Sequence, residues 1–301
     1  MDNTQIVAST NNDNKLLQGS NMTVQNALLT ILIEKIRTDT LVLPSLPEIA
    51  LKIRKMADDP NVNLHQMSEM ISHDPALTAR IMKIANSAFV GRGVHVNSLQ
   101  QATTRIGLRY IKNVVTAMAM EQLFVSKTPF IKSQMDHVWA ETLEITAFAL
   151  TTMQQYNSHF KYTAVNFDTM TLAGLVHNIG ALPILTEAEK HHEIFGGEGF
   201  IQQSIASMSS NIGGTILRSW GFNEELIEVA EQWHTSTYQP KHPSYLDFIR
   251  LAAINQGYFK AEGEETELYQ PYIDAGLITS TEFYQTPEFK TLFNEIKQLF
   301  V

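Results

Sequence analysis

One histidine lies at the centre of an apolar stretch and is followed at once by an asparagine. The stretch reads LAGLVHNIGALPIL over residues 172–185, and the pair is His177 and Asn178. A histidine followed by an aspartate can bind one metal ion through an imidazole nitrogen and a carboxylate oxygen. An asparagine amide has nearly the shape of a carboxylate but carries no charge, so its oxygen is a poor ligand for a transition metal. The pair therefore predicts a metal site only if other residues supply the missing charge.

The composition excludes several kinds of site. The 301 residues contain no cysteine, which excludes disulfides and thiolate zinc sites and suits a reducing compartment. The N-terminus lacks the basic and apolar segments of a signal peptide, and no run of about 18 apolar residues is present. The formal net charge of −9 argues against wholesale binding of nucleic acid. We therefore expect a soluble, cytoplasmic protein without a membrane span.

Positive charge is concentrated in one segment of this acidic chain. No aspartate or glutamate lies between Pro75 and Met120. The segment can be a solvated face that pairs with acidic residues elsewhere. It can instead be a docking face for an acidic partner, a nucleotide-like small ligand or a nucleic-acid backbone. The candidate anion- and partner-binding residues are Arg80, Lys83, Arg92, Arg105, Arg109 and Lys112.

The elements that must position these residues are helices. Apolar residues recur at helical spacing throughout the chain, and no alternating strand pattern of useful length is present. We expect Ser133 to open a long helix and Asp168 to cap the helix that carries His177. The fold class predicted by these patterns is all-α. Further helix starts are predicted at Asn63, Asp74, Ser98, Asn223, Ser244 and Thr286.

Three blocks of the sequence carry signatures of one family. The first is LPSLP followed by HDPALTARIMKIANSAF and QATTRIGLRYIKNVV; the second is LAGLVHNIGALPIL, and the third is IGGTILRSWGFNEELIEVAEQWH. Together, over residues 43–258, they resemble an HDOD domain, a bacterial relative of the HD-type metal-dependent phosphohydrolases. The resemblance implies a multi-helix bundle in which an N-terminal helical subdomain packs on a degenerate HD-like subdomain.

The resemblance also suggests how the chain is divided. Residues 1–21 are expected to be a disordered lead-in, because they are polar and have few apolar anchors. Residues 22–130 match the N-terminal helical part of the domain, and residues 131–258 match its HD-like part. Residues 259–301 hold an acidic connector and a C-terminal amphipathic helix, which we expect to pack on the body of the protein.

The resemblance places the metal ligands of the parent HD fold on this sequence. That fold uses a histidine, a His-Asp pair and a distant aspartate, sometimes with further histidines. Only two of the matched positions clearly keep a histidine, and His137 lies one turn before another of them. Two neutral imidazoles and one glutamate leave a divalent cation without the carboxylates that neutralise it. We therefore expect no metal, no cofactor and no catalytic residue at the matched positions Glu141, His177, Asn178, Ser209, His234 and Ala253.

The resemblance implies a role in regulation, since HDOD domains are generally regarded as non-enzymatic. We expect a bacterial signal-transduction protein that acts by binding a partner, such as a sensor kinase, a cyclic-dinucleotide enzyme or a transcriptional component. One alternative is a divergent metal-dependent phosphohydrolase that acts on nucleotides or cyclic dinucleotides. It would use His177 and His234 with either His137 or Glu141. A second alternative is a nucleic-acid-associated regulator that uses the basic region 75–120.

Overall fold

The described part of the chain is built from helices joined by loops. No strand occurs among the described residues, which confirms the all-α prediction. The expected lead-in, residues 1–21, lies outside them. The computed structural model describes residues 30–300 except for 39, 88–89, 91–93, 161–162, 192–197, 236–237, 241 and 261–264.

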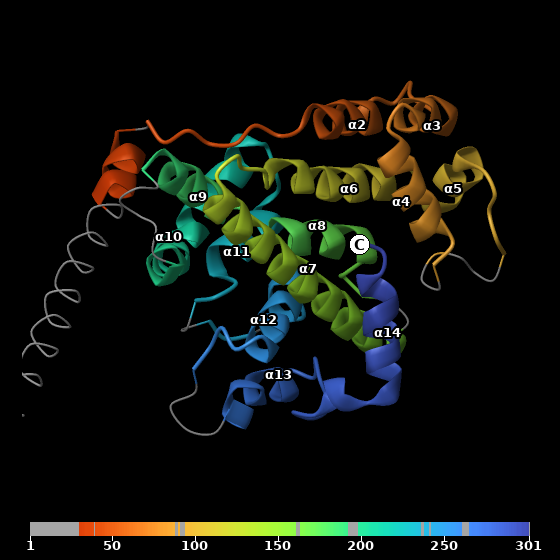
Figure 1. The fold of residues 1–301 in the computed structure, drawn as a ribbon. Helices are drawn as coiled ribbons and strands as arrows, with labels where there is room; N and C mark the ends of the chain where they lie inside the picture. Colours follow the sequence, from red (N-terminus) through yellow and green to blue (C-terminus); the bar gives the residue numbers. More distant parts are fainter. Residues whose placement is uncertain are drawn as a thin grey trace, which may run out of the picture.

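The first half is a layer of short helices that begins with a helical segment over residues 30–37. In Figure 1 this layer forms the upper edge of the molecule, where α2 packs on α6 and α5 packs on α3 and α4. The layer consists of α2 (Glu48–Asp58), α3 (Leu64–Ser72), α4 (Pro75–Ala85), α5 (Leu99–Ile106), α6 (Leu108–Ala119) and the short 3-10 helix η1 (Met120–Leu123).

The second half is arranged around one long helix, α7, which crosses the molecule diagonally in Figure 1 and contacts α8, α12 and α14. Its helices are α7 (Pro129–Ser158), α8 (Phe167–Val176), α9 (Ala181–Lys190), α10 (Glu198–Ser219), α11 (Glu224–Gln232) and α12 (Tyr245–Asn255). The C-terminal part adds η2 (Glu265–Leu268), α13 (Gln270–Asp274), η3 (Phe283–Gln285) and α14 (Pro287–Lys297).

A continuous apolar core joins the two halves. Helix α6 lies between α2 and α8, and its Ile111, Val114 and Val115 are fully buried. These residues belong to the same hydrophobic cluster as the inner faces of α7, α8 and α12. A polar contact adds to this packing, because the Trp220 indole at the end of α10 donates to the Pro44 carbonyl oxygen at 3.0 Å.

Two predicted helix starts are wrong. Helix α7 begins at Pro129, ahead of Ser133, because a proline at the first helical position has its φ already set for the helix. Helix α8 is capped by Asn166, whose side chain accepts from the Thr169 amide at 3.0 Å. Asp168 instead lies buried within the first turn and accepts from the Asn113 side chain at 2.8 Å. The other predicted caps are confirmed: Asn63, Asp74, Ser98, Asn223, Ser244 and Thr286 each accept from a backbone amide of the helix that follows.

The C-terminal helix packs on the body of the same chain, as predicted. Helix α14 lies against α7, and the Phe289 ring centroid is 5.0 Å from that of Phe148. An ion pair between Lys297 and Glu144 closes the polar edge of this contact.

One apolar stretch of the described residues bears on the expectation that the chain has no membrane span. The stretch Phe167–Lys190, which covers α8 and α9, has a window of mean hydropathy 1.3 and is long and apolar enough to span a membrane by composition. However, 94% of that window is buried inside the fold. The stretch therefore serves as the core of the helical bundle.

Candidate functional site

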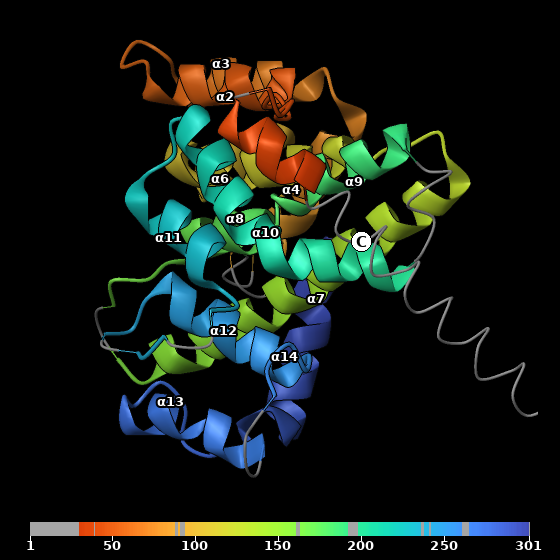
Figure 2. The same ribbon diagram turned by 90° about the vertical axis from the view of Figure 1, so that its left-hand side faces the viewer.

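Four of the positions matched to HD metal ligands line one cavity of about 730 Å³. Glu141 comes from α7, Asn178 from the turn after α8, Ser209 from α10 and His234 from the residues after α11. Figure 2 faces the side of the molecule on which α10, α11 and α12 lie. The rest of the wall is formed by Gln134, His137, Val138, Gln202, Gln203, Ile205, Ala206, Trp233, Gln256, Gly257, Tyr258 and Lys260.

His177 lies behind this wall and is 1% exposed. Its Nδ1 faces the Gly174 carbonyl oxygen at 2.5 Å, so this nitrogen carries the proton of the neutral ring. The ring meets the Trp233 indole edge-on, with centroids 4.7 Å apart. Burial lowers the pKa of His177 to about 4. The side chain is therefore a neutral packing group, and it is not among the residues that line the cavity.

His234 and Glu141 are both engaged with neighbours at the cavity. The His234 Nε2 lies 3.2 Å from the Ser210 hydroxyl, and burial lowers the pKa of this imidazole. The Glu141 Oε2 accepts from the Tyr258 hydroxyl at 3.0 Å, while its Oε1 lies 3.4 Å from the His137 Nε2. Burial raises the pKa of the Tyr258 hydroxyl, so this phenol remains a donor to the carboxylate.

Gly180 allows the His177–Asn178 turn to approach α10. A Cβ at this position would lie 1.9 Å from the Ser209 carbonyl oxygen and 2.6 Å from the Gly213 amide nitrogen. Only a residue without a Cβ permits such an approach between two backbones. The approach brings the Asn178 turn against α10 at Ser209, and both residues contribute to the same cavity wall.

Three buried polar atoms of the wall have no hydrogen-bond partner among the described residues. They are the Asn178 Oδ1, the Ser209 Oγ and the Trp233 Nε1. The residues are 5%, 1% and 1% exposed, respectively. The spacing of Trp233, Tyr258 and the glutamines in the sequence gives no signal of a site. The one indication in the sequence is that Trp233 directly precedes His234, which lies at a matched metal-ligand position.

The donor set does not fit a divalent metal ion. Among the described residues, no group of three or more histidine, aspartate or glutamate side chains could hold one. His177 is not among the residues that line the cavity, and Ala253 is fully buried in α12 without any donor in its side chain. The backbone oxygen of Ala253 accepts from the Tyr258 amide at 3.0 Å. A catalytic metal needs about three protein ligands that converge on one point and an open position for water, and the described residues bring no such group together.

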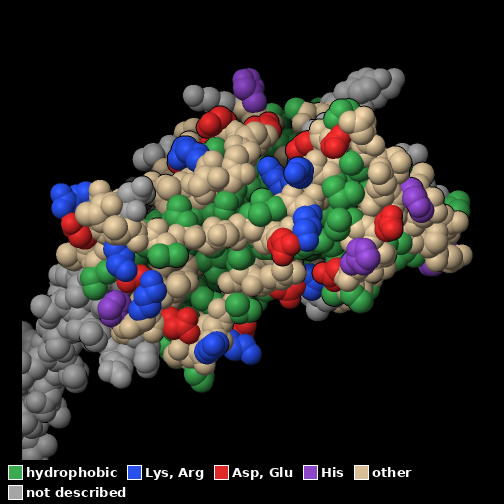
Figure 3. All heavy atoms as spheres, turned by 90° about the horizontal axis from the view of Figure 1, so that it is seen from above, with side chains coloured by type: hydrophobic (Ala, Val, Ile, Leu, Met, Phe, Trp, Pro, Cys, Tyr) green, Lys and Arg blue, Asp and Glu red, His purple; other side chains and the backbone are tan. Residues whose placement is uncertain are grey.

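The candidate basic residues whose side chains the structure describes do not line this cavity. Arg80 pairs with Glu121 at 2.6 Å and Lys112 with Asp58 at 2.5 Å, so both contact acids outside the basic segment. Lys83 is exposed on α4, whereas Arg92 and the side chain of Arg109 lie outside the described part of the structure. Figure 3, which views the molecule from the side of α2 and α3, shows basic and acidic side chains interleaved, with apolar surface between them.

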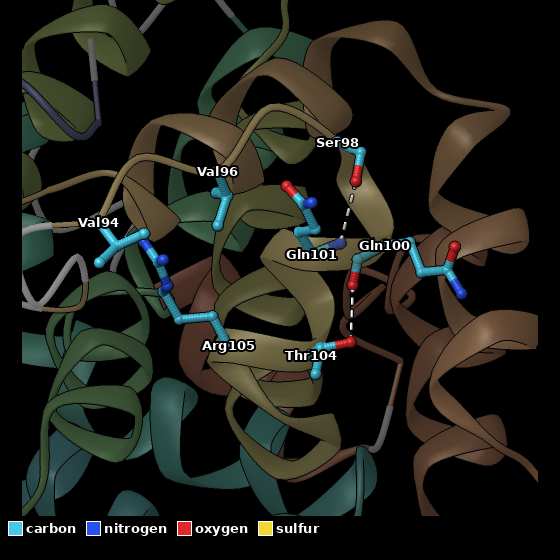
Figure 4. Close-up of a pocket in the computed structure, with 7 residues that line it drawn as sticks. All are labelled: Val94, Val96, Ser98, Gln100, Gln101, Thr104 and Arg105. Atoms are coloured by element: carbon cyan, nitrogen blue, oxygen red, sulfur yellow. Dashed lines mark hydrogen bonds between the residues drawn. The ribbon is translucent and has the colours of Figure 1, made fainter.

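Arg105 lies at a separate hollow of about 840 Å³ on α5. Figure 4 shows this hollow, with Ser98 bonded to the Gln101 amide and Thr104 to the Gln100 carbonyl oxygen. One guanidinium nitrogen of Arg105 donates to the Ala85 carbonyl oxygen at 3.1 Å. The hydrogen bonds of these polar groups thus lie within α5 or join it to the end of α4, and the hollow shares no lining residue with the cavity at Glu141.

Comparison with known proteins identifies relatives over most of the chain. A solved structure from Shewanella amazonensis SB2B, described as a candidate metal-dependent phosphohydrolase, is 40% identical, with a TM-score of 0.87 over 93% of this chain and 100% of that one. A candidate signal transduction protein from Marinobacter aquaeolei VT8 is 18% identical, with a TM-score of 0.57 over 93% of this chain and 66% of that one, and shows the shared fold.

A curated relative is longer than this chain. An uncharacterized protein from Treponema pallidum (strain Nichols) is 23% identical over an alignment of 209 residues, and the match covers 66% of this chain and 39% of that protein. The model of the HDOD domain matches residues 43–236. This match includes helices α2 through α11 and the residues of the cavity wall up to His234. We conclude that the chain belongs to the HDOD domain family.

Proposed function

We propose that this HD-like regulatory protein is non-catalytic and acts in cytoplasmic signal transduction by binding another protein. The proposal that the protein is non-catalytic rests on the residues that stand at the positions matched to the metal ligands of the HD fold. Asn178, Ser209 and Ala253 offer no negative charge, and His177 is not among the residues that line the cavity. Without a metal-bound hydroxide, nothing in the wall generates a nucleophile for a phosphate ester.

A lone general base would not replace the metal. His177 does not line the cavity, and burial keeps its pKa low. His234 contacts a hydroxyl, Ser210, rather than a carboxylate that could orient it as a base. Glu141 is held between Tyr258 and His137 at the rim. Lys260 is the one lysine or arginine among the described lining residues, so these side chains lack the concentrated positive charge that would stabilise a reacting phosphate.

The part of the proposal that concerns partners is supported by apolar surface on the N-terminal half. Val125 is 69% exposed and Leu51 is 53% exposed. Val125 also borders a hollow of about 410 Å³, lined mainly by apolar residues of α2, α4 and α6. Protein interfaces bury side chains of this kind. Val125→Glu is expected to weaken binding of a signalling partner while leaving the melting temperature within about 2 °C of wild type.

Metal content is the direct test of the non-catalytic proposal. The protein is incubated with manganese, iron, zinc or magnesium, desalted and subjected to elemental analysis, and phosphodiesterase and phosphomonoesterase activity is assayed in parallel. We expect substoichiometric metal and no turnover above that of the metal alone. One or two tightly bound transition-metal ions per chain, together with phosphodiesterase or phosphomonoesterase turnover, would refute the proposal.

The second candidate is a divergent metal-dependent phosphohydrolase. The observation that favours it is the description of the Shewanella amazonensis relative, which is 40% identical. In this chain it would use His177 and His234 with either His137 or Glu141, and all of these except His177 line the cavity. His234→Ala would then abolish both the metal content and the turnover, whereas the non-catalytic proposal expects neither quantity to change.

A further inference from the structure

Part of the wall of the cavity at Glu141 comes from outside the family match. The HDOD model matches residues 43–236, whereas four residues of the wall lie within 256–260, where α12 has ended. One of them, Tyr258, contacts α7, because its hydroxyl donates to the Glu141 Oε2 at 3.0 Å. This tyrosine therefore joins two elements of the cavity wall that are distant in the sequence.

Tyr258 also covers the Trp233 indole. The indole meets the rings of His177, His234 and Tyr258 edge-on, with centroids 4.7, 4.6 and 4.9 Å away. His177 is buried and His234 is half-buried, whereas Tyr258 is 38% exposed. The indole itself belongs to a residue that is 1% exposed. On the side of Tyr258, one partly exposed ring thus separates the indole from solvent.

The backbone around the Tyr258 side chain is fixed. Gly257 has a φ of 79°, a conformation that favours glycine, and it turns the chain away from α12. The Tyr258 amide then donates to the Ala253 carbonyl oxygen at 3.0 Å. The next ring, that of Phe259, has its centroid 4.8 Å from the guanidinium carbon of Arg250. The part of this segment that can move most easily is therefore the Tyr258 side chain.

Arg250 also fixes the residue that carries the indole. Its Nη1 donates to the carbonyl oxygens of Gln232 and Trp233, at 2.8 and 3.3 Å. The side chain is 4% exposed, so these bonds are shielded from water. One buried guanidinium thus holds both the backbone of Trp233 and the ring of Phe259, and this frame stays in place when the Tyr258 side chain moves.

The bond that holds the Tyr258 side chain against α7 is weak. The Glu141 side chain is partly exposed, so water competes with the phenol for its carboxylate. One hydrogen bond of this kind shifts an equilibrium by only about three- to tenfold. Rotamers of partly exposed side chains exchange rapidly. A second rotamer of Tyr258 is therefore accessible without any change in the rest of the fold.

We infer that Tyr258 is a gate on this cavity. In the closed form its hydroxyl donates to Glu141 and its ring covers the Trp233 indole. In the open form the side chain has rotated about its Cα–Cβ bond, water has replaced the phenol at Glu141, and the indole is part of the exposed wall. A hydrogen-bond donor that binds Glu141 in place of the phenol favours the open form, so occupancy of the outer cavity controls its depth.

Solvent exchange of the Trp233 indole N–H reports the opening of this gate in the whole protein. The N–H has no hydrogen-bond partner among the described residues, so its protection comes from burial. The sequence contains three tryptophans, and Trp233→Phe identifies the signal in a nitrogen-15 spectrum. Exchange is measured at several urea concentrations below the unfolding transition, because urea promotes global unfolding but hardly affects a local opening. The amide of the fully buried Val115 in α6 serves as the reference for global unfolding.

We expect Trp233 exchange to be independent of urea at low concentration. It should become about three- to tenfold faster in Tyr258→Phe, which removes only the hydroxyl. Glu141→Ala should give a similar acceleration, and the two effects should not multiply in the double variant, because both remove the same hydrogen bond. Tyr245→Phe is the matched control, since the Tyr245 hydroxyl accepts from Asn166. It should keep the wild-type Trp233 exchange even if it lowers the urea midpoint.

Three results would overturn the gate. Trp233 exchange that rises with urea in parallel with the Val115 amide would show that only global unfolding exposes the indole. Unchanged exchange in Tyr258→Phe would show that the bond to Glu141 does not hold the side chain. Equal acceleration in Tyr245→Phe would show that a general loss of stability exposes the indole. The gate goes beyond the proposed function, since bound metal with turnover would refute the non-catalytic proposal and leave the gate intact.

Discussion

At the scale of single residues, burial determines the behaviour of His177. An ordinary histidine has a pKa of 6.5, and burial lowers that of His177 to about 4. Between these pH values the unfolded chain binds a proton that the folded chain does not. The neutral His177 imidazole therefore makes its full contribution to the free energy of unfolding above about pH 6.5. That contribution is lost, and the protein becomes less stable, as the pH falls toward 4.

His177→Asn tests this pH dependence, because the amide can still donate to the Gly174 carbonyl oxygen but cannot titrate. Between pH 7.5 and pH 4.5 we expect the wild type to lose about 2 kcal/mol more of its unfolding free energy than the variant loses, since one pKa unit corresponds to about 1.4 kcal/mol. Urea unfolding at the two pH values gives both differences. Titrating groups that do not interact with His177 are common to both proteins, and their contributions cancel. If the unfolding free energies of the wild type and of His177→Asn change equally with pH, His177 does not titrate as proposed.

Asn178 lies at a position matched to a metal ligand of the parent HD fold. Replacing it by aspartate tests whether one added carboxylate is enough for this chain to bind a metal ion. In Asn178→Asp we expect no stoichiometric manganese after desalting, because Ser209 and Ala253 still supply no ligand. We also expect the free energy of unfolding at neutral pH to fall by about 1–3 kcal/mol, since a buried carboxylate is left without a cation. The triple variant Asn178→Asp, Ser209→His, Ala253→Asp is the comparison expected to retain metal. Stoichiometric metal in the single variant would contradict this prediction and would show that Asn178 alone prevents metal binding.

At the scale of elements, the cavity depends on how closely the turn between α8 and α9 approaches α10. Gly180→Ala would put a methyl group against the Ser209 carbonyl oxygen, and two backbones would have to separate. We expect a loss of about 3 kcal/mol or more in unfolding free energy, together with a shift of the Trp233 indole signal. Gly199→Ala is the matched control within α10, because its Cβ would meet nothing within 4 Å. It is expected to be neutral or to stabilise slightly. Equal effects of the two substitutions would refute the close-approach argument.

At the scale of the whole molecule, the sequence predicts local features well and distant contacts poorly. Caps such as Asn63 and Asp74 are recognisable because donor and acceptor lie three residues apart. Asp168 was misread because its partner, Asn113, comes from α6 and leaves the capping role to Asn166. The cavity wall gave the same difficulty, since Tyr258 reaches Glu141 across 117 positions of the chain. The family resemblance named four of the wall residues, but the glutamines and Trp233 could not be recognised from spacing.

The two helical halves predicted from the resemblance share one core, and we expect them to unfold together. Helix α6 packs on α2 and α8, and Trp220 of α10 donates to Pro44 ahead of α2. Neither half can therefore open without exposing apolar surface of the other. Far-UV circular dichroism and indole fluorescence should give the same urea midpoint, although the tryptophans all lie in the second half. Ile111→Ala in α6 removes a fully buried side chain and should lower both midpoints equally, by an amount corresponding to about 2–5 kcal/mol. A variant that retains its fluorescence midpoint while losing helical signal earlier would show that the halves are separate folding units.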